Sequence, residues 1–298
     1  MEKGTGLSAF GKAVPRRFFD VGIAEEHAVT FAAGLAAKGL KPVAAIYSTF
    51  IQRSVDQVIH DVALQNLPVT FALDRSGFVG EDGETHQGLF DIALFRPVPN
   101  MTLLAPASES ELALMLDWSL RRPEVQNSLK YQNPGPVMIR DPKCLCPPED
   151  PVFSLPLEAG RGVFVRQRGA SVCLAFTGSL YPEVLAAAEQ LTAAGLAADL
   201  YNLRFLKPID EDYLASLMNR YRLMVFIEEG VREGGFGEYA AELALRRNCT
   251  GRVLVIGVEG NFEALGTRQE LLQMNGLNGE GIAGRVTAEC TENLHRGH

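Results

Sequence analysis

The sequence predicts an α/β protein of two domains, each with a mainly parallel sheet flanked by helices. Three observations support this fold class. The chain has 298 residues, which is enough for two domains of about 150 residues each. Short β-rich runs alternate with amphipathic helical segments, as in doubly wound parallel sheets. A proline-rich stretch near the middle of the chain interrupts this alternation and predicts a boundary between the domains.

The first half of the chain contains four apolar runs that are predicted to be buried strands. They are Pro42–Tyr47, Val69–Leu73, Met101–Ala105 and Val137–Ile139. The segments between them repeat apolar residues at helical spacing and predict amphipathic helices. These are Glu25–Lys38, Ser54–Leu64 and Ser108–Leu120. The first domain is expected over residues 1–143. It is expected to be incomplete at its N-terminus, because no strand and helix precede the first ligand-carrying turn.

Residues 144–160 are predicted to form a linker, since the sequence from Asp141 to Gly160 has five prolines and no sustained periodicity. After it, over residues 161–298, a second α/β domain is expected. Its predicted strands are Val172–Phe176, Ala198–Asn202, Leu223–Glu228 and Val253–Val258. Its predicted helices are Pro182–Ala194, Asp210–Asn219 and Phe236–Arg246.

Composition narrows the class of function. Hydrophobic residues make up 47% and charged residues 21% of the chain, the balance of a globular protein, and no apolar run predicts a membrane span or signal peptide. A net charge of −8 argues against a nucleic acid partner. Five cysteines without a CxxC pair favour a reducing cytoplasm. Cys144 and Cys146 lack the two further ligands that a metal site would need.

Two segments with unusual residues begin near predicted strands or helix starts, where open α/β sheets bind ligands. In Asp20–Gly34, Glu25 and its neighbour Glu26 open an apolar helix, and the helix dipole would favour carboxylates there whatever their function. In Ile46–Gln57, two aromatic residues and an arginine follow a strand. Core packing explains the aromatic residues better than it explains the arginine.

The third segment, Asp74–Gly88, is the most informative. It has four glycines and no apolar periodicity, and it follows a strand directly. Such loops often bind ligands. Arg75 offers a guanidinium for an anion, Asp82 and Glu84 offer carboxylates, and His86 offers an imidazole that titrates near neutral pH. From these residues alone, a solvated polar loop that binds no ligand is an equally good interpretation.

These segments resemble a known family. FFDVGIAEEHAVTFAAGLA, PVAAIYSTFIQRSVDQVIHDVALQNLPV and DRSGFVGEDGETHQGLFD are similar to consecutive segments of 1-deoxy-D-xylulose-5-phosphate synthases, in the transketolase superfamily. The resemblance continues through FLKPID, EEGVREGGFGE and GTRQELL. It implies a pyrimidine-binding domain followed by a transketolase C-terminal domain. The family's diphosphate-binding motif is not matched, because Glu81-Asp82-Gly83 is the only similar triplet and has no asparagine partner.

The resemblance also implies roles for individual residues. Glu25 would hydrogen-bond the pyrimidine ring of thiamine diphosphate and so act in catalysis. Phe50 would stack on that ring, while Tyr47 and Arg53 would line the same cofactor pocket, with Tyr47 also reaching the substrate. No residue of this chain is expected to bind the metal, since the Mg²⁺ would be held by the diphosphate domain.

The substrate side of the pocket is implied in the same way. Arg75 and Arg140 match the pair that binds the phosphate of glyceraldehyde 3-phosphate, and Asp82 and His86 match catalytic residues that face the reacting carbonyls. Two departures from the family pattern are present. Glu26 stands where the family commonly has glutamine, and the run 141–144 reads DPKC instead of YPRG, which is expected to weaken the phosphate site.

The resemblance implies a cytoplasmic, homodimeric, thiamine-diphosphate-dependent transferase. It would condense pyruvate with glyceraldehyde 3-phosphate to 1-deoxy-D-xylulose 5-phosphate and CO2, for isoprenoid, thiamine and pyridoxal biosynthesis. The diphosphate domain would be supplied in cis or in trans, and the isolated chain would be inactive. Alternatives are another transketolase-like enzyme, a 2-oxoacid dehydrogenase β subunit, or a truncated dimerisation module without catalysis. The stretch 121–133 is longer than the usual connection and has no assigned function.

Overall fold

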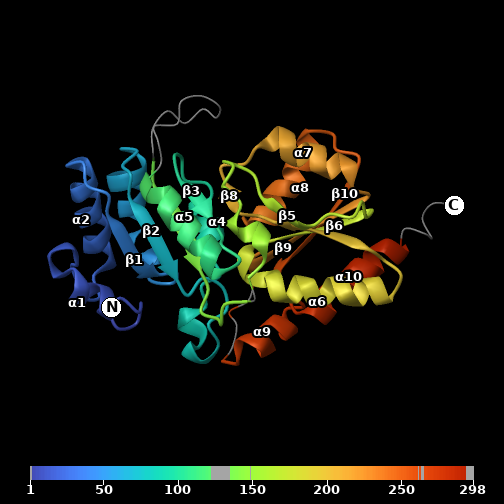
Figure 1. The fold of residues 1–298 in the computed structure, drawn as a ribbon, viewed down its shortest axis with the longest axis horizontal. Coiled ribbons are helices and arrows are strands. Elements are labelled where there is room, and N and C mark those ends of the chain that lie inside the picture. The colour runs from blue at the N-terminus through green and yellow to red at the C-terminus, as the bar shows by residue number, and fades with distance from the viewer. Residues whose placement is uncertain (1, 122–134, 148, 261, 263–264, 293–298) are drawn as a thin grey trace.

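Two α/β lobes make up the computed structural model, which describes residues 2–121, 135–147, 149–260, 262 and 265–292. The first lobe holds the N-terminal half and the second holds the C-terminal half (Figure 1). Of the longer connection predicted over 121–133, all but Arg121 lies outside the described residues. Both lobes have a five-stranded, mainly parallel sheet with helices packed on it, so the predicted fold class is confirmed.

The first sheet has the strand order β1-β2-β4-β3-β8. Its strands are β1 (Val43–Tyr47), β2 (Thr70–Asp74), β4 (Val137–Asp141), β3 (Thr102–Leu104) and β8 (Phe205–Lys207). The first four pair in parallel and correspond to the four predicted strands. Helix α2 (Glu25–Ala37) packs against β1, and α5 (Glu109–Arg121) packs against β4. Two shorter helices, α1 (Ser8–Ala13) and α4 (Asp91–Phe95), complete the lobe.

The predicted helix Ser54–Leu64 is not one regular α-helix. The segment begins with a 3₁₀ turn at Ile51–Ser54, has a short α-helix α3 at Val55–Gln57, and continues as a π-helix over Val58–Ala63. In a hydrogen bond of the wider π type, the backbone N–H of Leu64 donates to the Ile59 carbonyl, five residues earlier, at 2.8 Å. Apolar spacing cannot distinguish these helix types, and π-helical turns often occur near functional sites.

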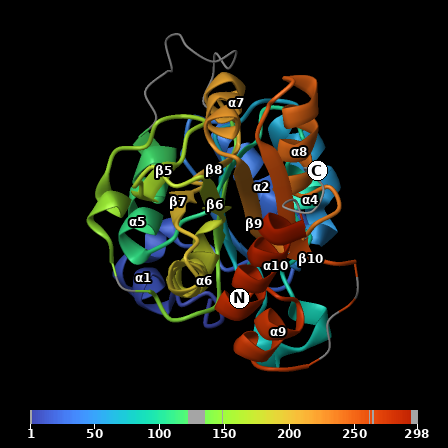
Figure 2. The same cartoon turned by 90° about the vertical axis from the view of Figure 1, so that its right-hand side faces the viewer.

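The second sheet has the strand order β10-β9-β6-β7-β5. Its strands are β10 (Arg252–Val258), β9 (Leu223–Val231), β6 (Val172–Phe176), β7 (Ala198–Asn202) and the antiparallel β5 (Val163–Arg166). Helices α7 (Glu211–Arg220) and α8 (Phe236–Arg246) cover one face, and α6 (Tyr181–Ala193) and α10 (Gly279–Glu292) cover the other (Figure 2). The short helix α9 (Arg268–Met274) lies below them. Strands β5 and β8 and helices α9 and α10 were not predicted from the sequence.

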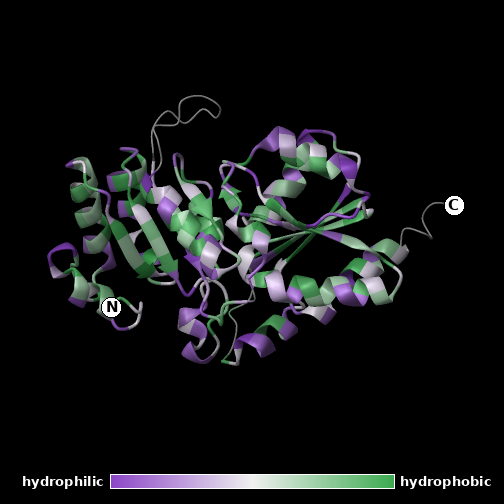
Figure 3. Cartoon of the chain, in the orientation of Figure 1, coloured by the Kyte–Doolittle hydropathy of each residue, from purple (hydrophilic) through white to green (hydrophobic). Residues whose placement is uncertain are grey.

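Strand β8 connects the two lobes. It comes from the C-terminal half of the chain, yet it pairs antiparallel with β3 and completes the first sheet. One cluster of buried apolar side chains accordingly runs through both lobes, with Leu103 and Leu206 among its members. The strands of both lobes are largely green in Figure 3, the colour of hydrophobic residues. No helix of the described residues is long and apolar enough to cross a membrane.

A buried ion pair fixes the linker to both lobes. The guanidinium of Arg204, just before β8, donates to Glu111 Oε1 on α5 at 2.6 Å, and Asn202 donates to the same carboxylate at 2.9 Å. Burial raises the pKa of Glu111. Arg204 also donates to four linker carbonyls, those of Val152, Phe153, Leu155 and Pro156. This arginine therefore joins the linker, the first lobe and the second lobe.

Candidate active site

The candidate site lies where the parallel strands of the first sheet end. Tyr47, Asp74 and Asp141 are aligned in register at the carboxyl ends of β1, β2 and β4. The polar segments that follow these strands therefore meet at one edge of the sheet, which is the usual ligand-binding edge of an open α/β sheet. The first turn of α2 reaches the same place, because Arg53 approaches Glu25 there.

Glu25 is the first residue of α2, and its carboxylate is held inside the protein. The residue is only 4% exposed, whereas the adjacent Glu26 is exposed. Its Oε2 lies 3.4 Å from Nη1 of Arg53. Its Oε1 is buried and has no hydrogen-bond partner. A buried carboxylate oxygen without a donor costs free energy, so this atom is placed to accept a hydrogen bond from a ligand.

Arg53 connects this carboxylate to a group of aromatic rings. The Phe50 ring lies 5.3 Å from the Tyr47 ring and 5.3 Å from the His86 ring, measured between centroids. The guanidinium carbon of Arg53 lies 4.6 Å from the Phe50 centroid. Phe50 is partly buried, so it offers an apolar face beside charged groups. The structure thus brings together the four residues predicted for the cofactor pocket, and it brings His86 to them.

The ligand loop, Asp74–Gly88, carries a network of charged groups. Arg75 donates from Nη2 to the Tyr47 hydroxyl at 2.7 Å, and its Nη1 lies 3.1 Å from Asp82 Oδ2. Lys143 Nζ donates to the same Asp82 oxygen at 2.8 Å. This hydrogen bond from Lys143 is the main reason that the pKa of Asp82 is lowered. Lys143, part of the DPKC departure, therefore brings a cation to the predicted site.

The backbone of Arg75 has an unusual conformation. Its φ of 63° lies in the left-handed region, which a residue with a side chain adopts at a cost. Its Nε is buried without a partner. Such backbone outliers are concentrated at functional sites, and here the conformation places the guanidinium over the Tyr47 ring, 4.2 Å from the centroid.

Arg140 is placed differently from Arg75. It is 4% exposed and forms two hydrogen bonds to Asp91, at 2.7 Å and 2.9 Å, and one to the carbonyl of Glu229 at 3.1 Å. These bonds use its Nε and Nη2 hydrogens, so Nη1 is the group that would remain for a phosphate. Sequence reasoning missed Asp91, whose carboxylate gives Arg140 a structural partner.

Two carboxylates lie at the base of the site. Burial, and next the neighbouring Asp74, raise the pKa of Asp141 to about 6. Burial likewise raises the pKa of Asp74. A pair of partly buried acids favours retention of a proton because the two negative charges repel. The run 141–144 therefore contributes a titrating carboxyl as well as Lys143.

Buried polar atoms without partners are concentrated in the three segments selected from the sequence. Among the described residues eight such side-chain atoms occur, and six belong to these segments. They are Glu25 Oε1, Ser48 Oγ, Thr49 Oγ1, Gln57 Oε1, Arg75 Nε and Gln87 Nε2. Sequence reasoning missed Ser48, Thr49, Gln57 and Gln87. The position of Ser48 and Thr49 directly after a strand was the signal that could have found them.

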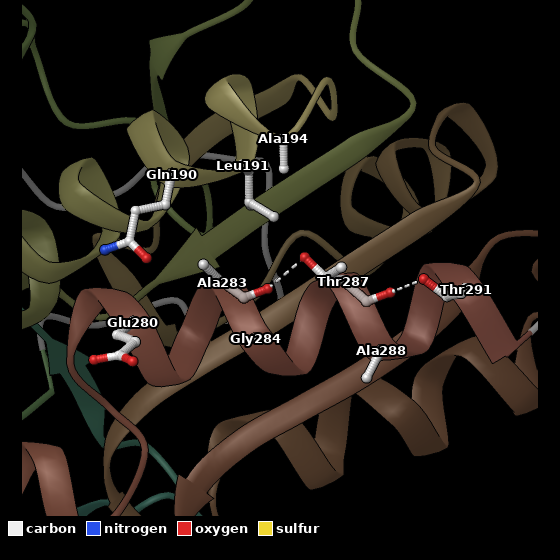
Figure 4. A pocket seen from close by; sticks show the side chains of 9 residues that line it. All are labelled: Gln190, Leu191, Ala194, Glu280, Ala283, Gly284, Thr287, Ala288 and Thr291. Carbon is white, nitrogen blue, oxygen red and sulfur yellow. Dashed lines mark hydrogen bonds between the residues drawn. The ribbon is translucent and has the colours of Figure 1, made fainter.

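A separate groove of about 700 Å³ lies between α6 and α10, in the other lobe (Figure 4). Leu191, Ala283 and Ala288 line it with apolar surface. The hydroxyls of Thr287 and Thr291 donate to carbonyls of their own helix, at 2.8 Å and 2.7 Å. The groove contains none of the predicted site residues and offers little polar chemistry.

Comparison with known proteins decides the family. A family model described as the pyrimidine binding domain of transketolase matches residues 1–146, and one described as the transketolase C-terminal domain matches residues 160–282. The chain belongs to the transketolase superfamily. Within the superfamily, it is 51% identical over 96% of its length to a 1-deoxy-D-xylulose-5-phosphate synthase of Treponema pallidum, and 42% identical over 99% to one of Proteus mirabilis.

This transketolase-superfamily chain spans less than half of those relatives, 44% and 45% of their lengths. Among solved structures, it matches a protein described as a split gene transketolase, inactive beta4 tetramer. The TM-score is 0.82 and the identity 29%, over 96% of this chain and 88% of that one. A Campylobacter jejuni transketolase shares the fold, with a TM-score of 0.72 and 18% identity over 91% of this chain and 39% of that one.

Proposed function

We propose that the chain forms the pyrimidine-binding side of a thiamine-diphosphate site in an enzyme of the 1-deoxy-D-xylulose-5-phosphate synthase type. The reaction would join pyruvate and glyceraldehyde 3-phosphate and release CO2. One observation carries the proposal: Glu25 buries a carboxylate whose Oε1 lacks a partner, and Arg53 contacts both this carboxylate and the ring of Phe50. The relatives, at up to 51% identity, support the choice of reaction.

The residues present fit the cofactor's pyrimidine ring. A buried acceptor, a partly buried aromatic face and the polar atoms of Ser48, Thr49 and Gln57 suit a flat, polar heterocycle. Glu25 would hold a proton between its Oε1 and a ring nitrogen, and Arg53 would keep that carboxylate in place. The cofactor, when bound, supplies the nucleophilic thiazolium carbon, while the protein supplies position and proton bias.

The Mg²⁺ ion and the diphosphate of the cofactor would be held by a further domain, separate from the two domains of this chain. The described residues contain no group of three His, Cys, Asp or Glu side chains that could hold a metal ion. We propose that this further domain is supplied in cis or in trans. We also propose a cytoplasmic homodimer, and we take residues 1–143 and 161–298 as the two domains of this chain. The match to a split-gene transketolase supports assembly in trans.

The isolated chain is expected to have no synthase activity with thiamine diphosphate and Mg²⁺, and to gain activity when a diphosphate domain is added. The physical reason is that the groups for the metal and the diphosphate are supplied elsewhere. Formation of 1-deoxy-D-xylulose 5-phosphate from the two substrates measures this. Product formed by the purified chain alone would contradict the proposal, and activity only with transketolase substrates would favour the sugar transketolase alternative.

Arg75→Ala is expected to raise KM for glyceraldehyde 3-phosphate about 10- to 100-fold in the reconstituted enzyme, the effect of losing a hydrogen bond to a charged group worth ~1.5–3 kcal/mol. KM for pyruvate should hardly change, because pyruvate lacks the phosphate. Arg75→Gly is the matched control, because it removes the same guanidinium and in addition relieves the strain of the left-handed backbone at this position. Equal losses for both substrates would show that Arg75 supports the fold or the cofactor instead.

A further inference from the structure

We infer that Glu229 and Arg268, both from the second lobe, are a positioning pair that fixes the ligand loop of the first lobe. The inference rests on the proposed function, because it gives the C-terminal domain a role in setting the groups that would meet the substrate. Neither residue belongs to the candidate site described above. Both act on the base of the loop, whereas Asp82 and His86 lie in its two 3₁₀ turns, Gly80–Asp82 and Glu84–His86.

Glu229 reaches the loop from the carboxyl end of β9. Its side chain is fully buried, and its Oε1 accepts a hydrogen bond from the backbone N–H of Phe78 at 2.9 Å. Two distant parts of the loop are bonded together at this point, since Gly77 and Gly88 exchange backbone hydrogen bonds of 2.7 Å and 2.8 Å. The carboxylate therefore holds the loop next to the point where Gly77 and Gly88 meet, at a buried position.

Glycine at position 77 makes this approach possible. A Cβ atom there would lie 2.6 Å from Cδ of Glu229, and the backbone φ of +90° is one that residues with side chains rarely adopt. The loop and the carboxylate are thus fitted to each other. The two lobes can approach each other this closely only because residue 77 has no side chain.

Arg268 supplies the charge that a buried carboxylate needs. Its Nε donates to Glu229 Oε1 at 3.1 Å, and its Nη2 donates to Oε2 at 2.5 Å. Arg268 is the first residue of α9, whose start is fixed by a capping box between Thr267 and Glu270. Without the guanidinium, the carboxylate would be buried and unpaired, which is strongly unfavourable.

The same pair reaches two further parts of the site. The backbone of Arg268 contacts the loop directly, because a Cβ on Gly80 would lie 3.0 Å from the Arg268 nitrogen. The loop lies beside α9 in both views (Figures 1 and 2). The carbonyl of Glu229 accepts from Arg140. One residue of the second lobe thus links the loop, the start of α9 and the arginine predicted to bind phosphate.

Amide hydrogen exchange on the 298-residue chain tests this positioning without cofactor or partner. Arg268→Met should speed exchange of the Phe78 and Val79 amides at least about 10-fold, because opening of the loop would lose a charge-assisted bond. Amides of β6, which report global unfolding, should speed up by a clearly smaller factor, since local opening of the loop adds a route that only the loop amides use. Arg268→Lys should restore part of the protection. Arg232→Met is the matched control, because its pair with Glu259 at 3.3 Å is exposed.

In the reconstituted synthase, Arg268→Met should lower kcat about 10-fold or more while KM for pyruvate stays within about 2-fold, because positioned groups act mainly in the transition state. Unchanged Phe78 exchange, or β6 exchange that rises in parallel, would overturn the inference. Faster loop exchange with unaltered kcat would overturn it as well. If the unmodified chain shows no synthase activity with any diphosphate domain, the proposed function fails, while the exchange result still decides whether the pair holds the loop.

Discussion

Glu25→Gln is expected to lower turnover of the reconstituted enzyme about 10²-fold or more, the range for loss of a positioned acid–base group. Glutamine keeps the volume of the side chain and the start of α2, but it cannot share an acidic proton with the pyrimidine nitrogen. Exchange of the thiazolium C2 hydrogen for deuterium should slow accordingly, and NMR of the bound cofactor measures it. Stability should fall by only ~0.3–1 kcal/mol, the value of a carboxylate at a helix N-terminus.

Glu26→Gln is the matched control for this experiment. Glu26 lies next to Glu25 in the same helical turn but is exposed, so its change should leave C2 exchange and turnover nearly unaltered. If Glu25→Gln exchanges C2 at the unmodified rate, or if Glu26→Gln is the more damaging change, then the assignment of the catalytic carboxylate to Glu25 is wrong.

Arg204→Met is expected to have the largest effect on stability, a loss of ~3–5 kcal/mol, because it leaves the Glu111 carboxylate buried without its countercharge. Both side chains are almost fully buried, at 2% and 0% exposure. The same change removes the donors to four linker carbonyls. Urea unfolding, with the midpoint and slope compared between variants, measures the loss.

Arg121→Met provides the comparison, since Arg121 pairs with Asp117 on the exposed face of α5. Exposed pairs of this kind contribute ~0–1 kcal/mol. Adding Glu111→Gln to Arg204→Met should recover part of the stability, because the unpaired charge is then removed. A loss for Arg204→Met no larger than that for Arg121→Met would show that the buried pair does not hold the linker.

The regular parts of the fold could be predicted because their signals are local. Val172–Phe176 is a strand with the predicted bounds, since a buried parallel strand is a continuous apolar run. Ala198–Asn202 also has its predicted bounds, although Asp199 and Asn202 interrupt its apolar residues. Phe205–Lys207 has only three residues, and its pairing with β3 depends on contacts about a hundred residues away. The π-helix at Val58–Ala63 has the same apolar spacing as an α-helix, so its hydrogen bonds could not be predicted.

The residues of the candidate site could be predicted from the sequence, but the residues that they contact could not. The ligand loop was selected because its charged groups and glycines are unusual directly after a strand, whereas the role of Glu25 was implied by the family resemblance, since the helix dipole alone explains a carboxylate there. The Asp91 partner of Arg140 was not selected, because an aspartate that opens a helix has an ordinary local explanation. The Lys143 contact to Asp82 also depends on the fold, since it brings together the ends of two neighbouring strands.

Strand β8 limits how the chain can be divided. A cut within 144–160 would separate β3 from the strand that covers its edge, and it would remove Phe205 from its contact with Trp118, whose ring centroid is 5.6 Å away. An uncovered edge beside apolar side chains invites association with other chains. Residues 1–146, which the first family model matches, therefore lack one strand of their own sheet. A recombinant N-terminal half should retain residues 205–207, for example through a circularly permuted or co-expressed second segment.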